Sequence, residues 1–458
     1  MSRGARRFML GLVASLCAVC LAIVLLNRDL LRDAQTPPSF DGAAAWLAEH
    51  PADVLAASAV SDGALDSNTP RRVELWREAY AHAKRLAPYR PNADAAFVRG
   101  GLFHWYELGR ADRARVLDAA EPLLRDPSFF SRMLAPLWQL TRDFAWLHAN
   151  APDGVEARTS LRDLAIARGL FGEYRVLRED IRARRLQQLA AERGTANPAT
   201  LLGLVPTHLT AADEPLVRGI LEELDRKPFN PEQVGSAAEV LVDYAVRHDI
   251  QPLTGILPLL ETPSPLRDVT RARAALDLHN ANAASRIEIT STVAGRPEWE
   301  AYFLDRAVFE ARRRDAKAAE AYLVRAAGHT PSLSLPLLAA GEQVAALLGK
   351  QKAAADYRRQ METHAKGPWS GLCGAELCGT AWRHEYVAGD TLRLELTMTQ
   401  SDETPPYVEV YVDDALRAEG AVKEARVFEV PVGRGVHRVE LRLVNVLTRN
   451  GTGRRVGL

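Results

Sequence analysis

The hydrophobic pattern of this chain changes its period once, near residue 366. From Asp41 to His364 apolar residues recur at spacings of three and four, as in "RVELWREAYAHAKRLAP", which predicts a series of short helices. After the change, "TLRLELTMT", "YVEVYV", "RVFEVPV" and "VHRVELRLVNV" alternate apolar with polar residues, which predicts antiparallel strands with one buried face. We therefore expect a mainly α chain, with a helical domain over 41–366 and an antiparallel β-sandwich of jelly-roll type over 367–458.

The N-terminus predicts a membrane anchor. Residues 8–26, "FMLGLVASLCAVCLAIVLL", carry no charge over 19 positions, and at about 1.5 Å per residue such a helix crosses a bilayer core. The three arginines within residues 1–7 predict a cytoplasmic stub, followed by a stalk over 27–40. We expect a signal-anchored, single-pass protein of a bacterial inner membrane with most of the chain in the periplasm. A cleaved signal peptide and a lipoprotein, lipidated at Cys20, remain the alternatives.

Charge and motifs exclude some classes of function. Lys+Arg and Asp+Glu both total 58, and this balance is unlike that of nucleic-acid-binding domains, so no nucleic-acid partner is expected. The chain contains no H-E-x-x-H, G-x-S-x-G or Walker A motif, so we predict that it is not an enzyme. An active site assembled from distant segments is the alternative that a sequence leaves open.

The helical part contains a repeat. In "EWEAYFLDRAVFEARRRDAKAAEAYLVRAAGHTP" (298–331), Ala307 and Ala319 stand at small positions, and Gly341 and Ala353 follow them by 34 residues. This unit resembles a tetratricopeptide repeat, and a weaker third unit ends at Pro127. The resemblance implies an α-solenoid that offers its surface to a partner protein. An irregular helical domain is the alternative.

Two other helical stretches have simple interpretations. The aromatic cluster of "GGLFHWYELG", from Phe103 to Tyr106, is interpreted as the core of a helical hairpin. The Arg-rich helix "VLREDIRARRL" mixes basic with acidic residues and is interpreted as a solvated face.

Cysteine spacing predicts a local disulfide. Cys373 and Cys378 lie close together in "GLCGAELCG", between the helices and the strands. A short-range pairing is the simplest interpretation for an exported chain. A zinc site is the weaker alternative, because zinc takes four ligands and no second Cys/His pair lies near.

The order of motifs in the C-terminal part resembles that of a carbohydrate-binding family. Val412-Asp413-Asp414 ends one strand, Gly435-Val436-His437 opens another that ends at Asn445, and a loop follows at 450–455. This arrangement resembles the calcium-dependent xylan-binding carbohydrate-binding modules. The resemblance implies a β-sandwich and, with it, polysaccharide as a possible partner.

The chain departs from that family at its calcium ligands. Val446 and Gly453 stand where the family has carboxylates, and calcium takes six to eight oxygen ligands. We therefore expect no cofactor, although calcium is the one ion that the resemblance leaves open. The remaining acids, Asp402, Glu403, Asp413 and Asp414, are interpreted as solvated turn residues.

A glycan site would then depend on aromatic side chains. On "YVEVYV", Tyr407 and Tyr411 share the face opposite Val408, Val410 and Val412, so we predict that both tyrosines are exposed and stack on sugar rings. The other candidates for glycan contacts are Trp382, Asp413 and Asn445. Packing in the core or linker is the alternative for the aromatic residues, and His437 is interpreted as structural.

Together these patterns predict a membrane-anchored periplasmic scaffold that assists the assembly or export of a cell-surface polysaccharide. The alternative is a pure protein scaffold whose β-domain only caps the helical array. An exposed Tyr407/Tyr411 pair favours the first function, whereas an apolar seam against the last helices favours the second.

Overall fold

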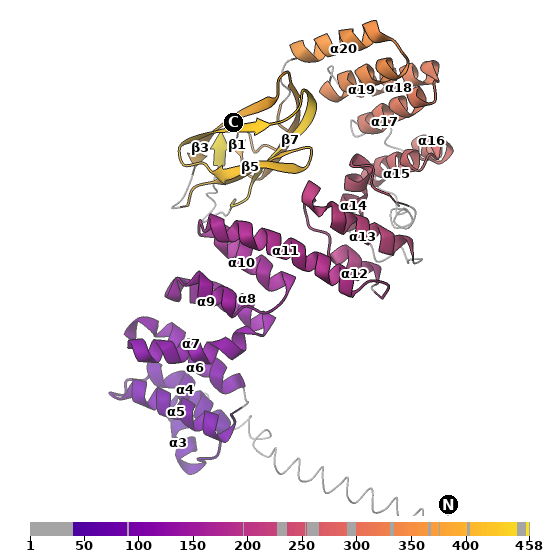
Figure 1. Ribbon diagram of the computed structural model, residues 1–458. Coiled ribbons are helices and arrows are strands. Elements are labelled where there is room, and N and C mark those ends of the chain that lie inside the picture. Colours follow the sequence, from indigo (N-terminus) through magenta and orange to yellow (C-terminus); the bar gives the residue numbers. More distant parts are fainter. Residues whose placement is uncertain are drawn as a thin grey trace, which may run out of the picture. The chain divides into compact units, whose positions relative to one another are not determined.

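The computed structural model (Figure 1) describes 12 stretches of the chain. These are residues 40–88, 91–195, 197–226, 236–251, 253, 265–290, 299–329, 334–364, 368–374, 376–400, 404–446 and 455–457. The predicted stub and membrane anchor, and all but the last residue of the stalk, lie outside them. Within these stretches no helix combines the length and the apolar character that a bilayer crossing requires.

The chain divides into two compact units, Met1–Leu161 and Arg162–Leu458. The first contains helices whose ends follow from local sequence: α4 and α8 begin after Asp53 and Asp126, whose carboxylates accept hydrogen bonds from backbone N–H groups of the first turn. Its core includes Trp76, which stacks on Phe97 at 4.0 Å between ring centroids. The helices are α3 (Phe40–Glu49), α4 (Val54–Gly63), α5 (Arg72–Leu86), α6 (Pro91–Phe103), α7 (Arg110–Leu124), α8 (Pro127–Thr141), α9 (Phe144–Ala149) and the first half of α10 (Val155–Ala167), with short 3₁₀ turns at Ala64–Asp66 and Trp105–Glu107.

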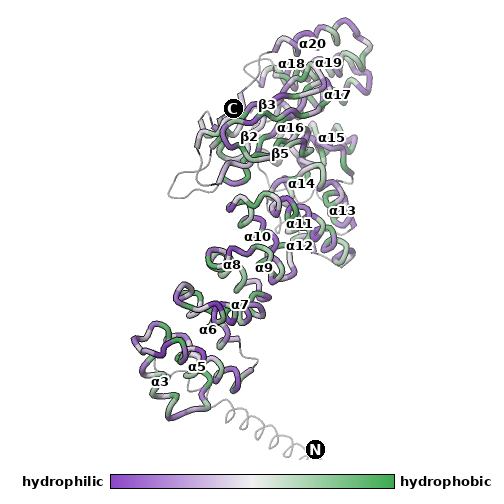
Figure 2. Tube along the Cα trace, turned by 60° about the vertical axis from the view of Figure 1, so that its left-hand side comes forward, coloured by the Kyte–Doolittle hydropathy of each residue, from purple (hydrophilic) through white to green (hydrophobic). Residues whose placement is uncertain are grey.

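The second unit continues with helices, whose apolar and polar residues alternate along the trace (Figure 2). They are α11 (Phe171–Ala191), α12 (Pro198–Gly203), α13 (Glu214–Asp225), α14 (Ser236–Arg247), α15 (Pro265–Asp277), α16 (Ala281–Thr290), α17 (Trp299–Arg312), α18 (Ala316–Gly328), α19 (Leu335–Leu347) and α20 (Gln351–Thr363), with a 3₁₀ turn η3 at Ala211–Asp213. The small repeat positions Ala307 and Ala319 are fully buried. A Cβ at Gly341 would lie 2.6 Å from the ring of Tyr357, so only glycine fits there.

The C-terminal part of this unit, which we call the sheet domain (368–457), contains two antiparallel sheets of four strands. One has the order β1 (Glu376–Leu377), β8 (Arg455–Gly457), β3 (Thr391–Gln400), β6 (Ala425–Pro431). The other, which we call the helix-facing sheet, has the order β2 (Thr380–Val387), β7 (Gly435–Leu443), β4 (Tyr407–Val412), β5 (Ala415–Ala421). Val408, Val410 and Val412 of β4 join residues of both sheets in one shared core. The predicted change from helix to antiparallel sheet is confirmed.

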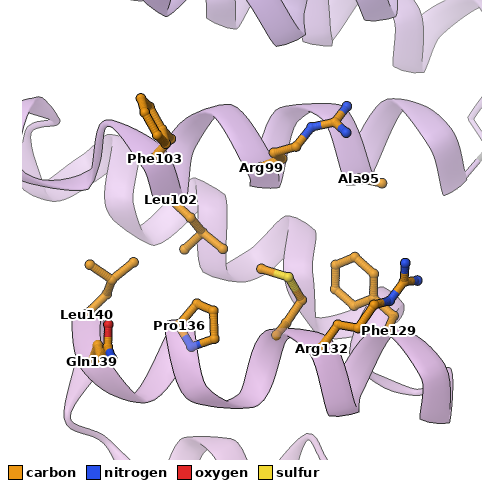
Figure 3. Close-up of a pocket in the computed structure, with 10 residues that line it drawn as sticks. Ala95, Arg99, Leu102, Phe103, Phe129, Arg132, Pro136, Gln139 and Leu140 are labelled. Atoms are coloured by element: carbon orange, nitrogen blue, oxygen red, sulfur yellow. The ribbon is translucent and has the colours of Figure 1, made fainter. Parts of the chain in front are cut away.

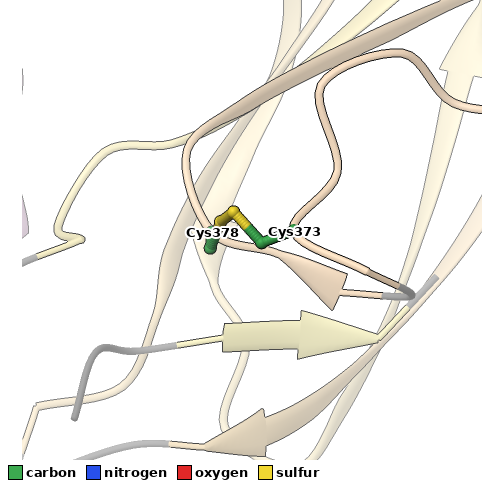
Figure 4. The surroundings of a disulfide bond; sticks show 2 residues. All are labelled: Cys373 and Cys378. Atoms are coloured by element: carbon green, nitrogen blue, oxygen red, sulfur yellow. A yellow bond between two sulfur atoms is a disulfide. The ribbon is translucent and has the colours of Figure 1, made fainter. Parts of the chain in front are cut away.

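Two local features shape the sheet domain. Asp413 and Asp414 form the two-residue turn between β4 and β5 with φ of 49° and 63°, left-handed values that Asp tolerates better than most residues. Cys373 and Cys378 form a disulfide, with Cα atoms 6.0 Å apart (Figure 4), which confirms the predicted local pairing. The bond closes a short loop just before β2.

Candidate functional site

The two tyrosines predicted to stack on sugars are buried. Tyr407 is 3% and Tyr411 2% exposed. Tyr407 stacks on Phe171 of α11 at 4.6 Å between ring centroids, and the ring of Tyr174 meets it edge-on at 5.7 Å. The predicted face of β4 is right, but its predicted exposure is wrong, because α11 covers this face.

Between the tyrosines lies a buried carboxylate that joins the sheet to α11. Glu409 is 3% exposed and accepts hydrogen bonds from the hydroxyls of Tyr174 and Tyr411, both at 2.7 Å, and from Arg178 at 2.6 Å. Arg178 also bonds to Glu419 of β5 at 2.8 Å. Burial and the neighbouring Glu409 carboxylate raise the pKa of both Tyr174 and Tyr411, which therefore act as neutral donors.

The charged row continues across β7. The guanidinium of Arg442 lies over the Tyr411 ring, 4.2 Å from its centroid, and pairs with Glu440. Arg438 pairs with the same Glu440 at 3.3 Å and with Asp414 at 3.1 Å. We call this row, together with its partners on α11 and α14, the ionic seam. Its four carboxylates and four guanidiniums belong to Glu409, Glu419, Glu440, Asp414, Arg178, Arg247, Arg438 and Arg442.

The β4–β5 turn carries the far end of the seam to α14. The Asp414 side chain is 5% exposed, pairs with Arg247, and lies 2.8 Å from the Nε2 atom of His248. Burial alone would raise the pKa of Asp414, but the hydrogen bond from His248 and the charges of Arg247 and Arg438 outweigh it, so the net shift is downward. Asp414 is a turn residue as predicted, but it is not solvated.

The remaining predicted glycan contacts are divided among other roles. Asn445 is 1% exposed and anchors the start of β4, accepting from Tyr407 N at 2.7 Å and donating to Pro405 O at 2.9 Å. Trp382 is half-buried beneath the Arg438 guanidinium, 5.1 Å from its ring centroid. Asp413, with 55% of its side chain exposed, accepts from Arg438 N at 2.9 Å. These residues do not form one open platform.

The structure describes His437 but only some of the acidic residues considered for calcium binding. The His437 ring lies 2.7 Å from the Asp413 carboxylate, a partner that the sequence did not indicate. No cluster of three potential metal ligands forms among the described residues. Asp402, Glu403 and Gly453 lie outside those residues, so the calcium prediction stays a prediction.

A second, apolar contact joins the sheet domain to the last helices. Leu335 and Leu338 of α19 and Met361 of α20 form a small core, against which Tyr386 of β2 and Val436 of β7 pack. This is the apolar seam that the cap alternative requires. The sheet domain is thus attached to α11 and α14 by charges and to α19 and α20 by apolar side chains.

A polar pocket of about 490 Å³ lies among α14, α15, α17 and α19. Its Arg273 bonds to Asp305 at 2.6 Å. Burial, and secondarily the Asp305 carboxylate, raise the pKa of Asp277 to about 6. Aspartates and arginines balance in the lining, so the pocket has no net preference for one sign of ligand charge when all are ionised.

An apolar groove of about 560 Å³ lies in the first unit, between α6 and α8 (Figure 3). We call it the α6/α8 groove. Its lining consists of Ala95, Arg99, Leu102, Phe103, Phe129, Arg132, Met133, Pro136, Gln139 and Leu140. Phe103 is 80% exposed, and Tyr106 nearby in sequence is 78% exposed, so their predicted place in a hairpin core is wrong; only Trp105 of this cluster is buried, at 6%.

Comparison of the chain with protein-family models, curated proteins and solved structures found no match.

Proposed function

We propose that this chain is a protein-binding scaffold: a tetratricopeptide-like helical array, anchored to a bacterial inner membrane through residues 8–26. In this proposal the sheet domain, of jelly-roll type, clasps the chain's own helices instead of binding a glycan. The observation that carries the proposal is the burial of Tyr407 and Tyr411, the best candidates for sugar stacking, beneath α11. The likeness to carbohydrate-binding modules then concerns the fold alone.

The chemistry of the covered face supports a permanent clasp. A glycan could reach the tyrosines only if α11 left β4, which would separate Arg178 from Glu409 and Glu419. Breaking a buried ion pair costs about 3–5 kcal/mol, because each charge loses its partner in a poorly solvated site. Fully paired buried charges also define one docking geometry, since any shift leaves some of them unpaired.

The helices remain available to a partner. Stacked helical hairpins form extended surfaces, and exposed apolar side chains mark several positions on them, including Val176 of α11 and Val324 of α18. With its glycan face covered, the chain meets its cellular partner through these helices.

Two assays on the full-length protein test the proposal. A photo-crosslinking amino acid at Tyr106, Val176 or Val324 should give discrete protein adducts in cells, whereas the same group at Val427, on β6 of the sheet domain, should not. A glycan array probed with calcium and with EDTA should show no binding. Reproducible glycan binding without any protein adduct would overturn the scaffold function.

A further inference from the structure

The α6/α8 groove has an apolar half built from regular helix spacing. Phe129, Met133, Pro136 and Leu140 follow one another at intervals of four, three and four residues, which places them on one face of α8. Leu102 of α6 points across the groove toward this face, and Phe103 lies at the same end of the groove with its ring turned away from α8 (Figure 3). Phe103 and Pro136 are exposed, and the other three side chains of α8 are only half-buried, so no element among the described residues of this unit covers the stripe.

The other half of the groove is positively charged. The two charged residues in the lining are Arg99 and Arg132, and both lie toward the end of the groove away from Phe103 and Leu140 (Figure 3). Arg99 is already paired with Asp62, at 2.9 and 2.7 Å. Arg132 donates its Nε–H to the Ser128 carbonyl at 3.1 Å and forms no salt bridge with a described carboxylate, although its charge acts on the nearby Asp126 carboxylate.

Proline adds an acceptor to this half. Pro136 has no N–H, so the carbonyl of Arg132, one turn earlier, does not receive its usual helical hydrogen bond. The groove therefore offers a cation without a salt bridge, Arg132, and a backbone carbonyl without its helical hydrogen bond at one end, and apolar side chains at the other.

Dimensions and backbone chemistry indicate the occupant. The lining residues of α8 run from Phe129 to Leu140, about 16 Å at 1.5 Å per residue, or about three helical turns. The walls are helices whose backbone groups bond internally, so an extended peptide would leave most of its own N–H and C=O groups unpaired in the groove. A helix satisfies its own backbone and presents one apolar face, which suits such walls.

We propose that the α6/α8 groove binds an amphipathic helix of a partner protein, with its apolar face against Phe103, Met133 and Leu140 and an acidic side chain paired with Arg132. This inference rests on the scaffold function proposed above and names the chemistry of the partner segment.

The test uses two designed 16-residue helical peptides that share one leucine face and carry either Glu or Lys beside it. Fluorescence anisotropy at fixed salt should show the Glu peptide binding the full-length protein about tenfold more tightly than the Lys peptide. Arg132→Glu should remove or reverse this preference, and Met133→Asp should abolish binding of both peptides. Val427→Asp, at an exposed apolar position on β6 outside the groove, is the control and should bind like the wild type.

Equal binding of the Glu and Lys peptides, or unchanged binding in Arg132→Glu and Met133→Asp, would overturn the proposal that the groove binds an acidic amphipathic helix. Binding of a small apolar dye and of neither peptide would also overturn it. Phe103→Gln keeps the test valid if Met133→Asp fails to fold, because this exposed side chain can change without touching the core; it should weaken the Glu peptide at least fivefold. Crosslinked adducts that persist in Arg132→Glu would leave the scaffold function standing while removing the groove from it.

Discussion

In the α6/α8 groove a phenylalanine is 80% exposed, whereas on the helix-facing sheet a glutamate is 3% exposed. Each of the two, Phe103 and Glu409, lies opposite to where its chemistry would ordinarily place it. The difference lies in their partners. Glu409 receives three hydrogen bonds from Tyr174, Arg178 and Tyr411, while no element in the described part of the first unit covers the apolar stripe beside Phe103.

In the ionic seam the buried groups find their partners within the chain, whereas the apolar side chains of the α6/α8 groove do not. A buried charge is tolerated only when close, well-aligned partners offset the free energy of its desolvation. The buried charges of the ionic seam have such partners within the chain. Contiguous exposed apolar surface is costly in water and usually marks a place where another molecule binds. The comparison therefore supports a stabilising role for the charged region and the recognition role that we propose for the apolar one.

The largest effect is expected from removal of the buried carboxylate of Glu409. Glu409→Ala should lower the free energy of unfolding by about 3–5 kcal/mol, because it leaves two buried hydroxyls without their acceptor and removes one of the two sheet carboxylates that pair with Arg178. Urea denaturation at pH 7 measures the change. The control Glu429→Ala alters an exposed carboxylate on β6 and should stay within about 0.5 kcal/mol of the wild type. A small effect at Glu409 would mean that the seam is not the clasp.

The next largest effect separates charge from backbone geometry at the β4–β5 turn. Asp414→Gly suits the left-handed φ of 63° better than Asp, yet it removes the acceptor shared by Arg247, His248 and Arg438. We expect a net loss of about 1–2 kcal/mol, since charge-assisted hydrogen bonds contribute more than the backbone strain costs. Asp414→Asn, which keeps the shape and loses the charge, should be destabilised in the same urea assay. A stabilised glycine variant would show that the turn, and not the charge, governs this contact.

Sequence periodicity predicted which residues share a face but not what covers that face. The alternation in "YVEVYV" correctly places Tyr407, Glu409 and Tyr411 opposite the valines of the core. The covering helix lies more than 200 residues earlier in the chain, a distance over which a local pattern carries no information. One signal was present: Tyr174 and Arg178 stand four residues apart on α11, on one helix face.

That helix was interpreted as a solvated face because its arginines alternate with acids. This prediction is wrong for Arg178 and Arg182, whose side chains are 17% and 18% exposed and pair with carboxylates beyond their own helix, Arg178 with Glu409 and Arg182 with Asp213. A mixed-charge helix can be solvated or matched to a complementary surface, and its own sequence does not distinguish the two. The α6/α8 groove escaped prediction for the same reason, since the spacing of apolar residues on α8 shows a stripe but not whether another helix covers it.

Lowering the pH should destabilise the sheet domain by a smaller amount. Burial, and secondarily the charge of Arg438, lower the pKa of His384 on β2 to about 4, below its unfolded value near 6.5. As the pH falls from 6.5 toward 4, His384 binds a proton in the unfolded chain but stays neutral in the folded chain. The free energy of unfolding should therefore decrease across this pH range. His384→Gln should match the wild type at pH 7 and lose stability less steeply in acid. Parallel pH profiles of the urea midpoint in the two proteins would contradict this assignment.

The smallest effect is expected at Phe103, although a phenylalanine is a residue type that usually contributes strongly to a folded core. Phe103→Gln should change the free energy of unfolding by less than about 0.5 kcal/mol, since an 80% exposed ring loses little contact when it is replaced. On the same helix Phe97 is fully buried, and Phe97→Ala should cost about 3–5 kcal/mol through the cavity it leaves. Circular dichroism and urea denaturation measure both. A loss above about 1 kcal/mol in Phe103→Gln would show that the groove is part of the folded core, and an exposed phenylalanine without a role in stability leaves recognition as the reason for its place.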